Sequence, residues 1–211
     1  MRQRLDLLMM RHPLGRFVVI VLAWLPVCFA IWYFSAPLLS VPMHWLALGV
    51  AKAGFGDIIL DIEKSGSLFS FVTSLRPASA TSFSSRSAAV VVESRSLLYT
   101  FGLPLYAALT IAAAGFGNGA RPMKLLAIGY VALLPFQTWG IFADALKQVA
   151  ITMGPAISSQ TGFSSFQREV IAFAYQFGTL ILPTVIPAVI WVLTQRAFLE
   201  RMSRDLARGQ E

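Results

Sequence analysis

Residues 124–143 decide the fold, and their sequence is KLLAIGYVALLPFQTWGIFA. After the first lysine the stretch carries no charge. It is long enough to cross a hydrocarbon core of about 30 Å as one helix of roughly 20 residues. Three further stretches share this length and character, and they are residues 17–35, 97–116 and 170–194. The sequence therefore predicts an α-helical membrane protein with four transmembrane helices.

The basic residues lie mainly on one side of the predicted helices. Together with Lys124, the N-terminal arm 1–16, the short turn 117–123 and the tail 195–211 hold ten basic and four acidic residues, a net charge of +6. The remaining residues include seven basic and six acidic ones, a net charge of +1. Because basic residues that flank transmembrane helices stay in the cytoplasm, this distribution predicts that both termini are cytoplasmic.

The composition argues against a soluble or nucleic-acid-binding protein. Hydrophobic residues make up 56% of the chain and charged residues 13%, whereas soluble domains carry about 25% charged residues. The isoelectric point near 10.1 is high enough for nucleic-acid binding, but that function gathers basic residues on one exposed face. Here they are spread over three segments beside the membrane, where anionic lipid is the natural counterpart. We expect the lipid bilayer as a partner and no nucleic acid.

Residues 36–96 form the longest segment outside the helices, and their pattern changes along the chain. Residues 43–53 are apolar but too short to span, which predicts a helix lying at the membrane interface. The stretch 57–63 alternates apolar and acidic residues, as a half-buried strand does. Residues 68–75 and 88–95 are the predicted partner strands, so this extracytoplasmic insertion should hold three short antiparallel strands.

One face of this predicted sheet is apolar and must be covered. The residues expected on that face are Ile58, Leu60 and Ile62 in the first strand and Phe69, Phe71 and Leu75 in the second. The interfacial helix and the outer ends of the membrane helices are the available cover. A Ser- and Ala-rich loop, residues 77–87, separates the second and third strands.

The other segments complete the predicted topology. The helix at 124–143 is expected to extend to residue 153, because the helical spacing of its residues continues beyond the bilayer. Residues 154–169 then form a second extracytoplasmic loop. The charged tail 195–211 is expected to be a helix along the inner surface.

Gln137 and Trp139 form the most distinctive polar cluster within a predicted membrane helix. A side-chain amide in hydrocarbon needs a partner on another helix. Two interpretations stay open. The two side chains face a neighbouring protein, or they close the bundle, with Trp139 in the aromatic belt at the membrane interface.

Asp144 and Lys147 are the charged residues nearest to the membrane core. Their i,i+3 spacing allows them to pair on one helix face, and about 20 residues after Lys124 they should lie at the outer interface. One interpretation is a binding site for a partner or substrate. The other is a solvated pair that stiffens the helix extension.

The sequence offers no catalytic or metal-binding constellation. Neither His12 nor His44 has Cys, Asp or Glu nearby at metal-ligand spacing. Cys28 lies in the middle of the first predicted helix, and neither histidine is placed to act as its base. We therefore expect no cofactor, no metal and no enzymatic activity.

Several stretches resemble a small family of bacterial membrane proteins. They are Trp24–Pro26, Ser35–Leu39, Phe69–Thr73, Leu97–Leu105 and Leu134–Phe142. The family is named for its association with exosortase, specifically exosortase H, and the similarity runs from the first helix to Met153. It implies a protein of the bacterial inner membrane that accompanies a transpeptidase acting on secreted proteins with a C-terminal sorting signal. The exosortase has Cys, Arg and His in its membrane domain, and this chain lacks that set.

Three hypotheses for the function follow. The first is a non-enzymatic accessory protein of an envelope sorting or export system, whose external sheet and Ser-rich loop contact a transpeptidase or its substrates. In this hypothesis the helix at 124–143 docks the partner in the membrane, with Gln137, Trp139, Asp144 and Lys147 as candidate contacts. The second is a subunit of a transporter or channel, although no inverted repeat is visible. The third is a membrane enzyme with an extracytoplasmic site at Asp144 or Asp61.

Overall fold

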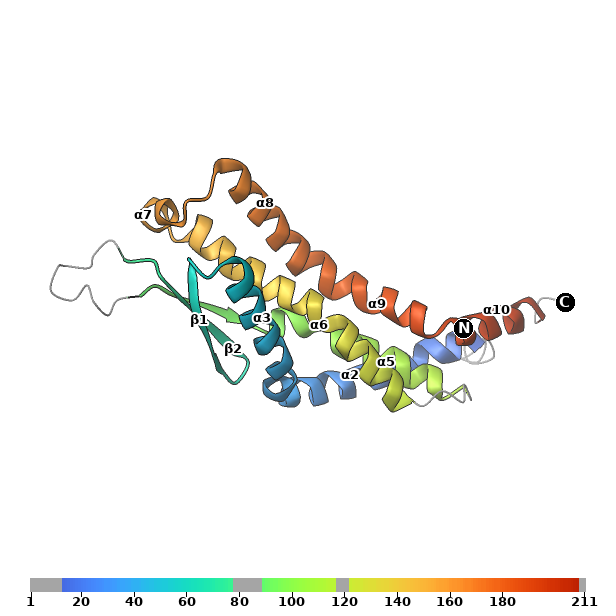
Figure 1. The fold of residues 1–211 in the computed structure, drawn as a ribbon. Coiled ribbons are helices and arrows are strands. Elements are labelled where there is room, and N and C mark those ends of the chain that lie inside the picture. Colours follow the sequence, from blue (N-terminus) through green and yellow to red (C-terminus); the bar gives the residue numbers. More distant parts are fainter. Residues whose placement is uncertain (1–12, 78–88, 117–121, 209–211) are drawn as a thin grey trace, which may run out of the picture. The chain divides into compact units, whose positions relative to one another are not determined.

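A computed structural model describes residues 13–77, 89–116 and 122–208 (Figure 1). The protein is mostly helical, with a small three-stranded antiparallel sheet and four helical stretches that are long and apolar enough to cross a membrane. These stretches are Pro13–Leu39, Leu97–Ala114, Pro122–Thr152 and Ser165–Thr194. The predicted fold class, four apolar helices with a small sheet, is confirmed.

Some predictions fall on residues that the structure does not describe. They concern the N-terminal arm up to residue 12, the Ser- and Ala-rich loop at 78–88 and the turn at 117–121. The last residues of the tail, 209–211, also lie outside the described ranges.

The elements follow one another in a simple order. The first half of the chain holds α2 (Pro13–Leu39), α3 (Val41–Gly54), β1 (Ile59–Ser65), β2 (Leu68–Thr73), β3 (Val91–Arg95), α4 (Leu97–Thr100) and α5 (Gly102–Ala114). The second half holds α6 (Pro122–Lys147), η1 (Gln148–Thr152), α7 (Pro155–Ser158), η2 (Ser159–Thr161), α8 (Ser165–Gln176), η3 (Phe177–Ile181), α9 (Leu182–Thr194) and α10 (Arg196–Arg208). Residues 41–54 and 196–208 are thus helical, as predicted.

Prolines mark several of the helix boundaries. Pro42 and Pro155 lie in the first turn of α3 and α7, where a proline loses nothing because the first N–H groups of a helix have no intrahelical acceptor. Pro104 has a different effect. It has no N–H for the carbonyl four residues earlier, and the break between α4 and α5 falls at that point.

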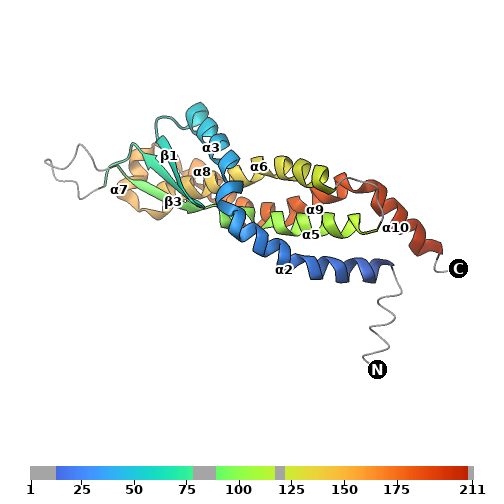
Figure 2. The same ribbon diagram turned by 90° about the horizontal axis from the view of Figure 1, so that it is seen from below.

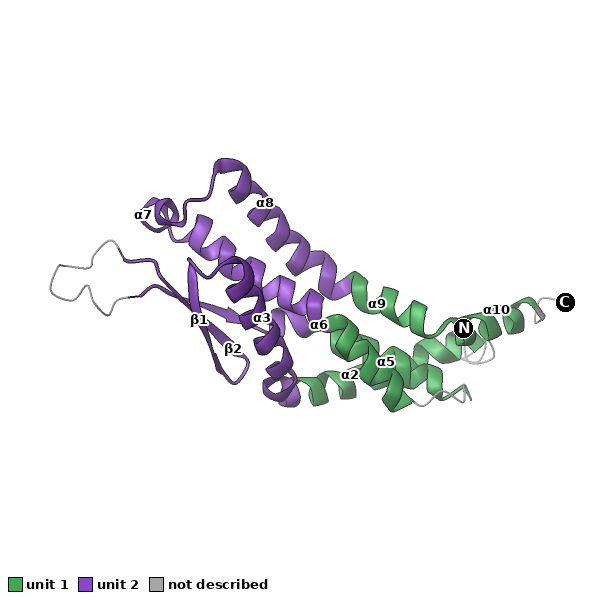
Figure 3. Cartoon of the chain, in the orientation of Figure 1, with its two compact units in different colours: residues 1–33, 101–133, 185–211 green, residues 34–100, 134–184 purple. Residues whose placement is uncertain are grey.

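The chain divides into two compact units, each built from distant segments (Figure 3). Unit 1 comprises residues 1–33, 101–133 and 185–211. Unit 2 comprises residues 34–100 and 134–184, and it contains the sheet. Each unit is described below by itself.

An aromatic cluster forms part of the core of unit 1. The Phe17 ring lies 5.7 Å from Trp191 and 5.2 Å from Phe198 between centroids, and Phe116 lies 5.9 Å from Phe198. Phe198 and Met202 are the buried residues of α10. The charged α10 helix is therefore held to unit 1 by its apolar face, while Arg201 and other polar side chains are exposed.

A glycine in α6 makes room for a buried tyrosine of α5. Tyr106 is 1% exposed, and its hydroxyl donates a hydrogen bond of 2.8 Å to the carbonyl oxygen of Leu125. A Cβ atom at Gly129 would lie only 2.1 Å from the Tyr106 ring. Close contact between α5 and α6 thus depends on the missing side chain at Gly129.

The sheet of unit 2 has the strand order β1-β2-β3, with both neighbouring pairs antiparallel. Ser65 pairs with Leu68, so the β1–β2 turn has two residues, and Gly66 takes a φ of +62° that favours glycine. On β2 and after it, Phe69, Phe71 and Leu75 are all buried. Their predicted place on the inner face of the sheet is confirmed.

The predicted inner face of the first strand is wrong at Leu60. Leu60 is 59% exposed, whereas Ile59 and Ile62 are buried. The register shifts between Ile59 and Asp61, where a β-bulge or similar irregularity interrupts the pairing with β2. An extra residue in one strand breaks the two-residue alternation, so the sequence pattern places Leu60 on the wrong side.

Two helices cover the inner face of the sheet. Helix α3 lies beside β1 (Figures 1 and 2) and buries the stripe Met43, Ala47 and Ala51, spaced four residues apart. The His44 ring nitrogen Nε2 lies 2.7 Å from the carbonyl oxygen of Ile62, which fixes the helix to the strand. From α6, the Phe142 ring packs 6.0 Å from that of Phe71. The predicted cover by the interfacial segment and a membrane helix is confirmed.

Replacing Gly129 with alanine should destabilise the protein. The new methyl group would overlap the Tyr106 ring, which is buried and cannot move away, and overpacking of this kind costs about 1–3 kcal/mol. The measurement is thermal unfolding in mild detergent. Gly49→Ala is the matched control, because a Cβ atom there meets nothing within 4 Å and a helical alanine gains roughly 0.5–1 kcal/mol over glycine. Equal effects of the two substitutions would contradict the packing described.

Candidate functional site

Gln137 and Trp139 lie on different sides of α6. Gln137 is 4% exposed, and its side-chain oxygen Oε1 has no hydrogen-bond donor among the described residues. Trp139 is 52% exposed, and its indole N–H donates to the carbonyl oxygen of Ala174 at 3.2 Å. Residues two apart on a helix do not share a face. Of the two, only Trp139 is available on the surface of the chain.

Asp144 connects the sheet to α6. Its carboxylate oxygen Oδ2 accepts a hydrogen bond of 2.6 Å from the Ser94 hydroxyl of β3 and one of 3.3 Å from the Gln148 amide. The Gln148 amide also donates to the carbonyl oxygen of Glu93 at 3.0 Å. These bonds fasten β3 beside the end of α6. The i,i+4 spacing in the sequence is a signal for the bond between Asp144 and Gln148, but not for the bonds of these residues to β3.

Lys147 has a different partner from Asp144. Its Nζ lies 4.5 Å from the centre of the Tyr175 ring, a cation–π contact that joins α6 to α8. Within the described ranges we find no ion pair between Lys147 and Asp144. The pairing that their i,i+3 spacing allows is not formed, because each side chain reaches a different neighbouring element.

Helices α6 and α8–η3 run antiparallel at very close distance. A Cβ atom at Gly140 would lie 3.2 Å from the carbonyl oxygen of Gly178, and one at Gly178 would lie 3.0 Å from the Cα of Gly140. Small residues permit such backbone contact between membrane helices. The contact sets the distance at which Trp139 reaches Ala174.

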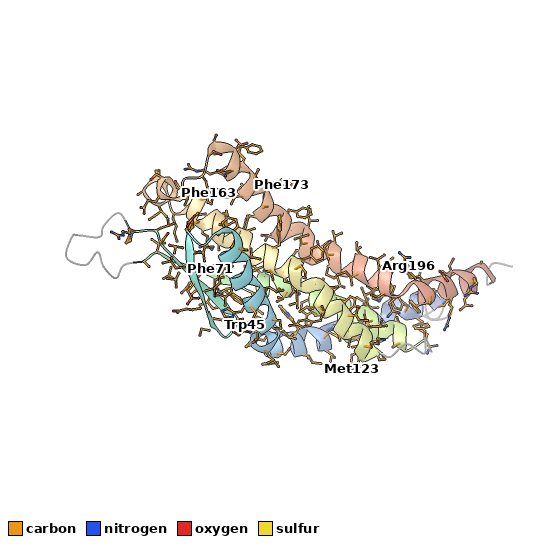
Figure 4. All side chains as sticks on the ribbon, in the orientation of Figure 1. Trp45, Phe71, Met123, Phe163, Phe173 and Arg196 are labelled. Atoms are coloured by element: carbon orange, nitrogen blue, oxygen red, sulfur yellow. The ribbon has the colours of Figure 1, made fainter. Side chains whose placement is uncertain are left out.

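An apolar hollow of about 430 Å³ lies between α3, α6 and α8. Its rim includes four exposed apolar side chains, Leu46, Val50, Trp139 and Val170. Deeper in the hollow, Phe142, Leu146 and Ile171 are buried. Figure 4 shows the side chains of unit 2, with Trp45 on α3 and Phe173 on α8 as landmarks. The hollow lies wholly within unit 2.

A second hollow, of about 340 Å³, follows where α8 meets η1 and α7. Arg168 and Glu169 both line it. One Arg168 nitrogen, Nη2, donates to the carbonyl oxygen of Ser158 at 3.2 Å, while the Nε N–H is buried and has no acceptor among the described residues. Nothing local in the sequence distinguishes Arg168 from other basic residues near helix ends.

A metal centre finds no support in the described part of the chain. No group of three His, Cys, Asp or Glu residues there is placed to hold a metal ion. Of the two histidines, His12 is outside the described residues, and the His44 ring is bonded to β1.

A model of one protein family matches residues 11–198, and its description is "Exosortase H-associated membrane protein". The chain belongs to this family. The match extends beyond Met153 and covers the fourth membrane helix as well as the sheet. With four apolar helices and this family, the protein is a multi-pass membrane protein. No curated protein and no solved structure matches the chain significantly.

The family is described by its association with exosortase H, so the exposed surfaces of unit 2 are of interest as places where a partner protein could bind. Of the four residues singled out in the sequence, Gln137, Asp144 and Lys147 are engaged inside the chain or between its elements. The outward face of the sheet offers another surface. Its central row is Glu63, Ser70 and Glu93, paired across the three strands, with both glutamates exposed.

Replacing Asp144 with alanine should loosen the sheet from α6. The substitution removes the acceptor of the Ser94 hydroxyl and of one Gln148 bond, and a part-buried donor left without a partner costs about 1–3 kcal/mol. Asp144→Asn keeps an acceptor oxygen and should cost less. Hydrogen exchange of β3 and thermal unfolding measure the effect, with the exposed Glu63→Ala as control. Unchanged exchange in Asp144→Ala would show that these bonds do not hold the sheet.

Proposed function

We propose that this protein is a non-enzymatic accessory subunit of exosortase H-dependent protein sorting in the bacterial inner membrane. The family match over residues 11–198 carries the proposal, because the family is described by its association with exosortase H. The accessory role is consistent with a chain whose polar candidates serve internal packing: Asp144 and Gln148 hold β3, and Lys147 holds α8.

The proposal assigns the partner contact to unit 2. The sheet is fastened at both edges, by His44 on β1 and by Gln148 on β3, so its outward face is presented as a rigid surface. Asp61, Glu63 and Glu93 are exposed residues of the two edge strands. Of the two candidate contacts within the membrane helix, we keep only Trp139 as the proposed partner contact, because Gln137 is buried.

The proposed topology has both termini in the cytoplasm and the sheet outside. Its support is the charge difference between the two sides, +6 against +1, together with the positive-inside rule. The sheet would then lie where secreted proteins are processed.

Cysteine labelling tests this topology. In a Cys28→Ala background, a cysteine at Leu60, which is 59% exposed on β1, should react with a membrane-impermeant maleimide from outside. A cysteine at Ser203, exposed on α10, should react only after the membrane is permeabilised. The reverse pattern would overturn the proposed topology.

Co-purification tests the accessory role. Exosortase H from the same membrane should be retained by the tagged protein in mild detergent. The double charge reversal Glu63→Lys with Glu93→Lys should lower the retained amount several-fold, since complementary charges set partner choice across an interface. Glu200→Lys, an exposed reversal on α10, is the matched control and should retain the partner.

The outcomes separate two parts of the proposal. If the unaltered protein retains no exosortase while both proteins are folded and present, the accessory role is wrong. If retention occurs but the sheet variant retains the partner fully, the role stands and the sheet is not the contact surface.

A further inference from the structure

Helices α6 and α8 run antiparallel (Figure 1), and two hollows follow each other along them. Leu146 and Ile171 line the apolar one. Ala150 and Arg168, one helical turn further along each helix, line the second one. A wholly uncharged hollow beside one that is lined by charged side chains, Arg168 and Glu169, is an arrangement that suits an amphipathic ligand.

The first hollow has nothing to offer a polar ligand. Only two of its lining residues have polar side-chain atoms, Thr138 and Trp139. The Thr138 hydroxyl donates to the carbonyl oxygen of Leu134 at 2.9 Å, and the Trp139 indole donates to that of Ala174. A polar group entering this space would lose its hydration without a replacement, at a cost of several kcal/mol. The hollow therefore selects hydrocarbon.

The volume fits one long hydrocarbon chain. An apolar cavity of about 150 Å³ takes one benzene molecule, and this hollow of about 430 Å³ is nearly three times as large. It therefore has room for on the order of 15–18 carbon atoms by the same measure. A helix, about 10 Å across, fills roughly 400 Å³ in a single turn, so a transmembrane helix would not enter beyond one turn.

The depth along the helices agrees with an acyl chain. A hydrocarbon core crossed by roughly 20 residues, counted from Lys124 at the start of α6, ends near Ala143. Counted backwards from Thr194 at the end of α9, it ends near Tyr175. The hollow runs from Pro135 to Leu146 on α6 and from Val170 to Ala174 on α8, which places it across this edge of the hydrocarbon. Of its exposed rim, Trp139 lies within the counted hydrocarbon, where lipid tails are present at high concentration.

The second hollow supplies a partner for an anionic headgroup. Arg168 lines this hollow, and a phosphate oxygen accepts strongly from a guanidinium. Lys147 is the other nearby cation on these helices and contacts the Tyr175 ring. Glu169 lines the same hollow and is exposed, so its carboxylate opposes an anion there.

We propose that unit 2 binds one phospholipid of the surrounding bilayer, with an acyl chain in the apolar hollow and the phosphate at Arg168. The site is independent of the proposed accessory function, because all its residues belong to this chain and no partner is needed to form it.

The test is native mass spectrometry of the delipidated full chain in mild detergent, titrated with dioleoyl phosphatidylglycerol. One lipid should bind per chain. Ala174→Leu fills the hollow but keeps the carbonyl that Trp139 uses, and Arg168→Gln removes the cation. Each should weaken binding about tenfold, whereas Glu169→Gln should strengthen it. Ala127→Leu, at an exposed alanine of α6 outside the hollow, is the matched control and should bind as the unaltered chain does.

A second lipid, which lacks the phosphate, distinguishes the contribution of the apolar hollow from that of Arg168. Diacylglycerol with the same acyl chains should bind the unaltered protein more weakly, and Arg168→Gln should not weaken it further. Thermal unfolding shows which variants are folded, and Val170→Trp at the rim replaces Ala174→Leu if that variant unfolds. Absence of a stoichiometric lipid on folded protein would overturn the proposal. So would equal binding by the unaltered chain, the filled hollow and Arg168→Gln.

Discussion

Every polar group of the chain that lies in hydrocarbon must find its partner within the protein, because no water is available there. The hydroxyls of the membrane helices obey this rule by bonding to the carbonyl oxygen four residues earlier. The pairs are Thr110 with Tyr106, Thr138 with Leu134, Thr179 with Tyr175, Thr184 with Leu180 and Thr194 with Ile190. Tyr106 and Trp139 obey it between segments, by donating to the carbonyls of Leu125 and Ala174. These last two bonds require close backbones, and the glycines at 129, 140 and 178 provide them.

The few exceptions to this rule are informative. Among the described residues, three buried side-chain atoms have no hydrogen-bond partner: Oε1 of Gln137, Nε of Arg168 and Nε1 of Trp191. Gln137 and Trp191 are themselves buried inside the chain. Arg168 is only half-buried and borders an open hollow. All three atoms are enclosed by the protein and therefore cost stability; Arg168 differs from the other two residues in that other parts of it line a hollow.

The sequence predicted the parts of the fold that depend on local pattern. The length of the apolar stretches predicted the four membrane helices, and the alternation of apolar and polar residues predicted the strands. An apolar stretch too short to span the membrane predicted α3. It failed at Leu60, because a break in strand pairing is set by the partner strand and leaves no mark in the apolar pattern. The candidate site was harder. The sequence identified Trp139 and Asp144 as candidates. It did not show which side of α6 packs against the other elements of unit 2, because that depends on tertiary contacts. The separate roles of Gln137 and Lys147 follow from those contacts. Arg168 and Ser94 gain their significance only from those contacts.

The length of two membrane helices explains how unit 2 combines a sheet with a lipid-facing hollow. The helical stretches Pro122–Thr152 and Ser165–Thr194 have 31 and 30 residues, about 45 Å each at 1.5 Å per residue, against a hydrocarbon core of about 30 Å. About ten residues of each must therefore leave the hydrocarbon at the same end. Asp144, Lys147 and Gln148 occur in that excess length and bind Ser94, Tyr175 and Glu93. Strand β3 is thus bonded to the excess length, and the apolar hollow begins in the same length, at Leu146 and Val170, and continues toward Pro135. A sheet bonded to this end of the two helices is a suitable surface for the proposed contact with a protein of the same membrane.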